Sequence, residues 1–185
     1  TRQFPEIVSA CSALQKDIQH LLPVRLDGEL AILRTPYQAN FSSIQTRGRM
    51  RAKDNIQQLS EKRPASFICF DILTYNGESL LSQPLKDRQQ KLAQFFQKFS
   101  FTPEAFQKIL SFTNIKEAEK ICFLHQGEGL VAKSLHSAYE EGKRTRQWLK
   151  WKNYRTIQGI ISGWNPQNDY FDVLTANDQV LGKVK

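Results

Sequence analysis

The stretch SFICFDILTYNGESL, residues 66–80, decides the fold. Its first half, Ser66–Leu73, is an almost unbroken apolar run in which Asp71 is the one charged residue. An apolar run of this length that is followed by a turn is typical of a buried strand, and Asn76-Gly77 supplies the turn signal. The sequence therefore predicts a central strand around which the rest of the chain is arranged.

Strand and helix patterns are interleaved on either side of this run. Strands are predicted at 25–33, 109–112, 129–134 and 148–152, and helices at 4–18, 84–99 and 115–124. The aromatic stripe of the helix at 84–99 is expected in the core. Residues 41–63 are polar and basic, which indicates a connection with one short helix. Because the pattern has no regular strand–helix–strand repeat, it favours an α+β fold.

A change of pattern near residue 157 predicts a domain boundary. Beyond it, short strand patterns are separated by turn signals at Asn165-Pro166 and Asn177-Asp178. We expect a first domain at residues 1–155 and the first strands of a second β unit at 156–185, too few for a complete five-stranded barrel.

Composition and charge narrow the class of protein. The chain has 185 residues, 40% of them apolar, and a net charge of +8, with cations gathered at 47–53 and 143–152. This balance favours a polyanionic partner such as nucleic acid, although solubility alone could also explain it. The sequence has neither an apolar signal core nor a run long enough to span a membrane, so we expect a cytoplasmic protein. Three widely spaced cysteines are expected to be buried, reduced thiols.

An acidic strand and a glycine-flanked acid are the first two segments that could hold chemistry. In a regular strand over LDGEL, residues 26–30, Asp27 and Glu29 share a face and could bind a divalent cation or a ribose; a solvated strand face is the alternative. In GEGLVAK, residues 127–133, the glycines around Glu128 would let a ligand approach the backbone closely. Neither segment is specific by itself.

The basic stretch GKRTRQWLKWK, residues 142–152, is the third. In a strand, Trp148, Lys150 and Lys152 share one face. Two neighbouring lysines on such a face suit a phosphate group, whereas a solvated basic edge strand is the alternative.

In this order, and together with FDILTYNGESL at 70–80 and PLKDR at 84–88, these segments resemble the nucleotidyltransferase motifs of ATP-dependent DNA ligases. The resemblance covers nearly the whole chain. It implies an adenylation domain, a core of antiparallel sheets flanked by helices, followed by the start of an oligonucleotide-binding (OB) domain. It further implies ATP and Mg²⁺ as cofactors and nicked duplex DNA as partner.

The resemblance also implies residue roles. Glu128, Lys150 and Lys152 would be catalytic, with Glu128 and Glu29 near the metal. The nucleotide would be bound by the residues Glu29, Phe70, Arg144, Lys150 and Lys152. DNA would be contacted by Arg47, Arg49 and Lys133, although Lys133 could instead be structural. Lys133 is five residues from Glu128, so both lie on one face only if Glu128 precedes the strand.

The family's nucleophile motif, Lys-x-Asp-Gly-x-Arg, has no match in these residues. Asp27-Gly28 is the sole Asp-Gly pair, and Arg25 stands at the lysine position; an arginine stays protonated and cannot act as the nucleophile. We therefore expect a ligase segment that begins after the nucleophile and ends within the OB domain. A catalytically inactive DNA-binding module is the alternative, and an RNA ligase or capping-type nucleotidyltransferase is a third.

Overall fold

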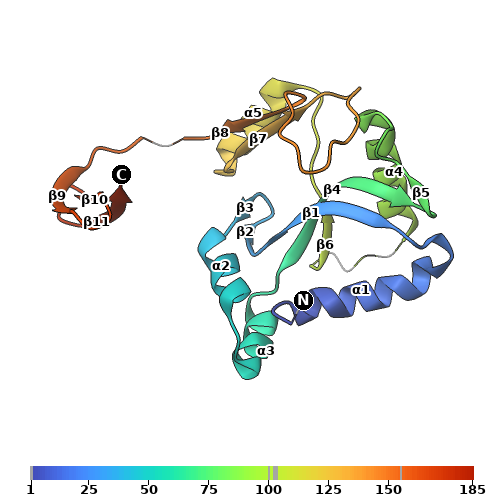
Figure 1. The fold of residues 1–185 in the computed structure, drawn as a ribbon, viewed down its shortest axis with the longest axis horizontal. Helices are drawn as coiled ribbons and strands as arrows, with labels where there is room; N and C mark the ends of the chain where they lie inside the picture. Colours follow the sequence, from blue (N-terminus) through green and yellow to red (C-terminus); the bar gives the residue numbers. More distant parts are fainter. Residues whose placement is uncertain (1, 100, 102–103, 155) are drawn as a thin grey trace. The chain divides into compact units, whose positions relative to one another are not determined.

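The chain folds into two compact units, Thr1–Asn153 and Tyr154–Lys185, in a computed structural model that describes residues 2–99, 101, 104–154 and 156–185 (Figure 1). The predicted domain boundary at residue 155 lies outside the described residues. The helices are α1 (Pro5–Ile18), α2 (Phe41–Arg49), α3 (Lys53–Lys62), α4 (Leu85–Lys98) and α5 (Ile115–Leu124), with a 3₁₀ turn, η1, at Gln19–Leu21.

The first unit is built on a sheet with the order β1-β4-β5, in which β6 also pairs with β4. The strands of this sheet are β1 (Arg25–Ala31), β4 (Ser66–Tyr75), β5 (Glu78–Ser79) and β6 (Phe106–Lys108). The pairs β1–β4 and β4–β5 are antiparallel, and β4–β6 is parallel. The predicted central strand is thus confirmed, as is an α+β fold of largely antiparallel sheets flanked by helices.

The main core lies where α1 and α4 pack on β4. Its buried residues are Leu14, Ile18, Cys69, Ile72, Leu80, Leu92 and Phe95. The aromatic stripe of α4 is part of this core, as predicted: Phe95 is buried and contacts Phe96, Phe99 and Phe101 edge-on or tilted. Such aromatic pairs add to the free energy gained by burying their apolar area.

Two local predictions were wrong. The basic connection forms two helices, α2 and α3, separated by an extended stretch that includes Met50 and Ala52. The strand expected at 109–112 lies earlier, at β6, where Phe106 pairs with Phe67 and is buried, whereas Ile109 and Leu110 are exposed. Tertiary pairing with β4 selected the earlier segment: the ladder runs over residues 106–108, and the Ile109 amide makes one further hydrogen bond to the Cys69 carbonyl of β4.

Two short hairpins complete the first unit. The strands β2 (Leu33–Thr35) and β3 (Gln38–Ala39) form one, and β7 (Gly129–Lys133) and β8 (Trp148–Lys152) form the other. In the first hairpin, Tyr37 stacks on His125 at the end of α5, with ring centroids 3.9 Å apart. Of the cysteines, Cys69 and Cys122 are buried as expected, but Cys11 is exposed on α1.

The second unit is a three-stranded antiparallel meander of β9 (Ile160–Asn165), β10 (Tyr170–Leu174) and β11 (Val180–Val184). Asp169 and Asp178 have positive φ angles of 58° and 59° in the two turns, a conformation that Asp tolerates better than most residues. No described helix of either unit is long and apolar enough to cross a membrane.

Candidate nucleotide-binding site

The β7–β8 hairpin presents the predicted basic face. Its cross-strand partners on that face are Lys133 with Trp148, Val131 with Lys150, and Gly129 with Lys152. On the opposite face Trp151 contacts Phe123 of α5 edge-on, with ring centroids 5.7 Å apart. The helix therefore supports one face of the hairpin, and Lys150 and Lys152 remain exposed on the other.

Glu128 lies immediately before β7. It therefore precedes the strand, which is the condition under which Glu128 and Lys133 could lie on one face despite their five-residue separation. Its carboxylate is largely exposed, and its Oε1 is 3.8 Å from Lys150 Nζ. The next residue must be glycine: Gly129 has φ +155°, and a Cβ there would come within 2.1 Å of the Trp151 carbonyl oxygen. The close approach of the two strands at Gly129 fixes the Glu128 backbone, whose carbonyl accepts from the Asn153 amide.

Phe70 occupies a bulge of the central sheet. In the β1–β4 ladder Asp27 pairs with Asp71 and Gly28 pairs with Cys69, so Phe70 has no partner on β1. Bulges of this kind redirect a side chain and occur next to active sites. The Gln89 side chain of α4 donates to the Phe70 carbonyl at 2.7 Å, which holds the bulge in place.

Lys133 joins Phe70 to the β7–β8 hairpin. Its Nζ lies 4.5 Å from the Phe70 ring centroid and 3.7 Å from that of Trp148. Both are cation–π distances. Burial lowers the pKa of the Lys133 ammonium, and the carboxylates of Asp71 and Asp27 act against this shift. The aromatic residue predicted to stack on adenine thus faces a cation in this structure.

A buried ion pair lies behind this face. Arg88 and Asp71 are both fully buried, and Arg88 donates from Nε and Nη2 to the two Asp71 carboxylate oxygens at 2.9 Å each. Arg88 Nη1 also donates to the carbonyls of Ser137 and Gln83. This bidentate pair fixes Asp71 beside Phe70 and ties the loop after β7 to α4. This pair was not predicted from the sequence, although both residues stand in the segments at 70–80 and 84–88.

Tyr139 connects the same loop to β1. Its hydroxyl donates to Asp27 Oδ2 at 2.5 Å, and its ring contacts Trp148 edge-on. Burial, and then the hydrogen bond to Asp27, raises the pKa of Tyr139 to about 12. Asp27 is therefore held by Tyr139, whereas Glu29, two residues later, is exposed.

The remaining predicted residues are dispersed or buried. Arg144 is exposed in the loop between β7 and β8. Arg49 is exposed, but Arg47 is only 2% exposed. Arg47 donates to the Glu6 carboxylate and to the carbonyls of Gln3 and Arg63. A buried guanidinium whose two terminal nitrogens already donate within the protein is not presented to DNA, so the DNA contact expected of Arg47 is replaced by a structural role.

The described residues contain no cluster of three or more acidic, histidine or cysteine side chains suited to a metal. Glu128 and Glu29 are nevertheless exposed carboxylates of the kind that Mg²⁺ uses. Mg²⁺ is commonly bound through one or two carboxylates together with the phosphates of a nucleotide. The donor set thus fits Mg²⁺ that arrives with a nucleotide better than a resident ion.

Comparison with known proteins identifies the family. The sequence model of the ATP dependent DNA ligase domain matches residues 1–152. The chain therefore belongs to the ATP-dependent DNA ligase domain family, and the predicted resemblance is confirmed. It is 31% identical over 185 residues to the bifunctional non-homologous end joining protein LigD of Bacillus subtilis, covering 96% of this chain and 30% of that protein. It is 34% identical over 155 residues to a DNA ligase of Thermococcus onnurineus, covering 82% of this chain and 26% of that ligase.

The solved structures agree with this assignment. A mycobacterial DNA ligase D complexed with ATP and MES aligns with a TM-score of 0.62 and 27% identity, over 93% of this chain and 53% of that one. The ligase domain of Mycobacterium tuberculosis LigD aligns with a TM-score of 0.55 and 25% identity, over 87% and 50%. The chain thus spans about half of these ligase structures and less than a third of the curated relatives above.

Proposed function

We propose that this chain forms the nucleotide-binding core of an ATP-dependent DNA ligase that seals nicks in duplex DNA. The observation that carries the proposal is the meeting of three distant segments at one face: Phe70 from β4, Lys133 from β7 and Trp148 from β8. An aromatic ring beside a strand with two exposed lysines suits a purine nucleotide, because the ring can stack on the base while the lysines neutralise phosphate charge.

Each residue then has a defined part in binding. Phe70 stacks on adenine, and Lys150 and Lys152 of β8 hold the phosphates. Arg144, in the loop between β7 and β8, supports the nucleotide. Glu29 contacts the ribose or the metal. Glu128 would hold Mg²⁺, because its exposed ion pair with Lys150, at 3.8 Å, is weak and leaves the carboxylate available.

We propose that Lys133 acts at the nucleotide rather than at DNA, because it lies between Phe70 and Trp148. The family reaction passes through a lysine–AMP and then a DNA–adenylate intermediate. The nucleophilic lysine of that reaction is not provided by a Lys-x-Asp-Gly-x-Arg motif within these 185 residues. The residues of this chain would orient ATP and neutralise phosphate charge, and Mg²⁺ would supply further electrostatic stabilisation.

The meander β9–β11 fits the proposal as part of an OB-type domain, since that fold is also built from short antiparallel strands. A DNA-binding module without nucleotide chemistry is the second candidate, and the net charge of +8 favours it. Binding of ATP distinguishes the two, because a module that binds DNA alone has no use for a nucleotide site.

The deciding experiment is equilibrium binding of ATP with Mg²⁺, followed by a test for covalent AMP after denaturation. We expect reversible binding that weakens about tenfold or more in Lys150→Ala but stays within about twofold in Lys143→Ala, since a bound phosphate contact is worth more than an exposed charge. We expect no AMP label that survives denaturation. Equal losses in both variants would refute the proposed nucleotide site, and a stable AMP label would show that this chain does contain a nucleophile.

A further inference from the structure

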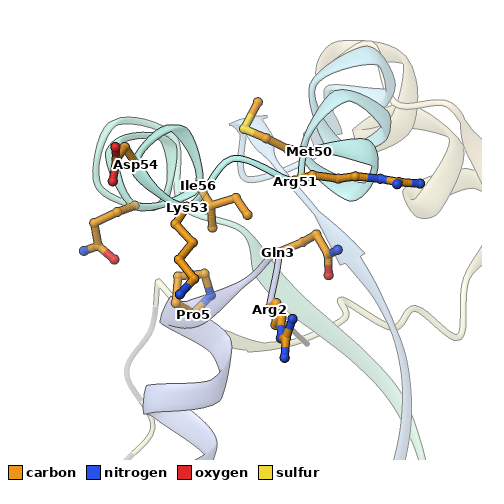
Figure 2. Close-up of a pocket in the computed structure, with 9 residues that line it drawn as sticks. Arg2, Gln3, Pro5, Met50, Arg51, Lys53, Asp54 and Ile56 are labelled. Carbon is orange, nitrogen blue, oxygen red and sulfur yellow. The ribbon is translucent and has the colours of Figure 1, made fainter.

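A basic groove lies between the start of α1 and the connection from α2 to α3 (Figure 2). Its volume is about 780 Å³, and its walls include the cations Arg2, Arg51 and Lys53. Asp54 is the one carboxylate among the nine described residues that line it. Figure 1 shows α3 and the β7–β8 hairpin at opposite ends of the first unit. The groove is therefore separate from the nucleotide face, as we call the surface formed by Phe70, Lys133, Trp148, Lys150 and Lys152.

The buried Arg47–Glu6 pair assembles this groove. Arg47 at the end of α2 donates to Glu6 in the first turn of α1, and the Ala65 amide donates to the same carboxylate. Although burial acts in the opposite direction, these donors lower the pKa of Glu6, so the pair stays ionised. The pair joins two segments that lie 41 residues apart and brings Arg2 close to Arg51 and Lys53.

The cations around the groove are available, in contrast to Arg47. Arg2, Arg49, Arg51 and Lys53 are exposed, and none forms an ion pair with any of the residues that the structure describes. The lining also includes the amide side chains of Gln3 and Gln57. Cations and neutral amide donors together are the groups that proteins use to contact phosphate oxygens of nucleic acid.

We propose that this groove binds the phosphodiester backbone of duplex DNA, as a contact surface apart from the nucleotide face. Its described lining contains no aromatic residue that could stack on a base, which argues against a mononucleotide as the occupant. The inference rests on the proposed function for its choice of DNA, and it adds which residues make the contact: Arg2, Arg51 and Lys53, with Arg49 beside them.

Charge reversal tests the groove. The double variant Arg51→Glu/Lys53→Glu is compared with Lys16→Glu/Lys86→Glu, which changes the net charge equally on exposed lysines of α1 and α4. Binding of fluorescein-labelled duplex DNA is measured at several salt concentrations, and binding of ATP is measured in parallel. For the groove variant we expect at least about a tenfold loss of DNA affinity and a salt dependence whose slope falls by about two, one for each phosphate that the variant no longer neutralises.

The Lys16/Lys86 control should lose less than about threefold, and ATP affinity should be unchanged in both variants. The reverse change, Asp54→Asn, should strengthen DNA binding, because it removes the carboxylate from the groove. Equal losses in the two double variants would reduce the effect to net charge and overturn the proposal. If the wild-type protein binds ATP but not duplex DNA, the groove proposal is wrong and the nucleotide site is unaffected. If it binds duplex DNA but not ATP, only the nucleotide site is rejected.

Discussion

Tyr139 donates a hydrogen bond to Asp27 across 112 residues of sequence. The bond joins the loop after β7 to β1, the strand that also carries Glu29. Its partner Asp27 lies opposite Asp71, which Arg88 holds from α4. The acidic strand, the central strand and the basic hairpin are therefore linked by polar contacts behind the nucleotide face, and each of these contacts can be tested singly.

Removing the Tyr139 hydroxyl should destabilise the protein by about 2 kcal/mol, because Asp27 loses a charge-assisted hydrogen bond at a partly buried site. Tyr139→Phe is the variant, and urea unfolding is the measurement. Since the pKa of Tyr139 is raised to about 12 in the folded state, its contribution is complete below the unfolded value of about 10. It is lost as pH rises through about 12. The difference between wild type and variant should thus be constant up to about pH 10 and shrink above it.

Asp27→Asn is the companion variant. Burial, the larger cause, still raises the pKa of Tyr139 there, but the charge of Asp27 is gone. Absorbance at alkaline pH should show this tyrosine ionising earlier than in wild type. An unchanged titration would mean that Tyr139 and Asp27 are not in contact in solution.

Arg47 and Arg49 should separate stability from DNA binding. Arg47→Met leaves the Glu6 carboxylate without its guanidinium partner at a largely buried site and should cost about 3–5 kcal/mol in urea unfolding. Arg49→Met should stay within about 0.5 kcal/mol, because surface substitutions rarely cost more, yet weaken duplex DNA binding. If Arg49→Met is the destabilising variant instead, the structural role belongs to Arg49 and not to Arg47.

The Arg88–Asp71 pair should behave as a coupled unit. Arg88→Met leaves a fully buried carboxylate and should cost about 3–5 kcal/mol. Replacing both residues, as in Asp71→Leu/Arg88→Met, should cost less than the Arg88 change alone, because no isolated charge remains. Unfolding by urea of the four proteins of this cycle gives the coupling free energy. Additive costs would show that the pair does not act as one unit.

Local patterns predicted much of the fold. The helix at 115–124 and the strand at 148–152 have the predicted bounds. These bounds could be predicted because both the periodicity and the family motifs are patterns of residues that are close in sequence. The face shared by Trp148, Lys150 and Lys152 followed from alternation and is seen in the β7–β8 register. The bounds of β6 did not follow, since pairing with β4 selects that strand.

The site was less predictable because its decisive contacts are tertiary. Arg47 and Arg49 stand in the same basic run, and only Glu6, 41 residues from Arg47, distinguishes the buried cation from the exposed one. The bulge at Phe70 arises from pairing with β1, which no single-strand pattern reveals. Cys11 lies among apolar neighbours in sequence, yet it is on the exposed side of α1.

Nucleotide binding should change the environment of Trp148. If adenine stacks on Phe70, Lys133 must leave the ring face that its ammonium occupies, and the cation 3.7 Å from the Trp148 ring moves with it. In a background of Trp151→Phe and Trp164→Phe, Trp148 is the sole tryptophan, and its emission should change on titration with ATP and Mg²⁺.

Two variants complete this test. Phe70→Leu should weaken ATP binding by about 1–3 kcal/mol, the range for losing one aromatic–base stack. Lys133→Met should abolish the ATP-induced change in Trp148 emission, because no cation is then displaced. If the emission change persists in Lys133→Met, it is caused by the nucleotide itself and not by displacement of the Lys133 ammonium. Silent emission in the parent, with ATP demonstrably bound, would mean that adenine does not use the Phe70 face.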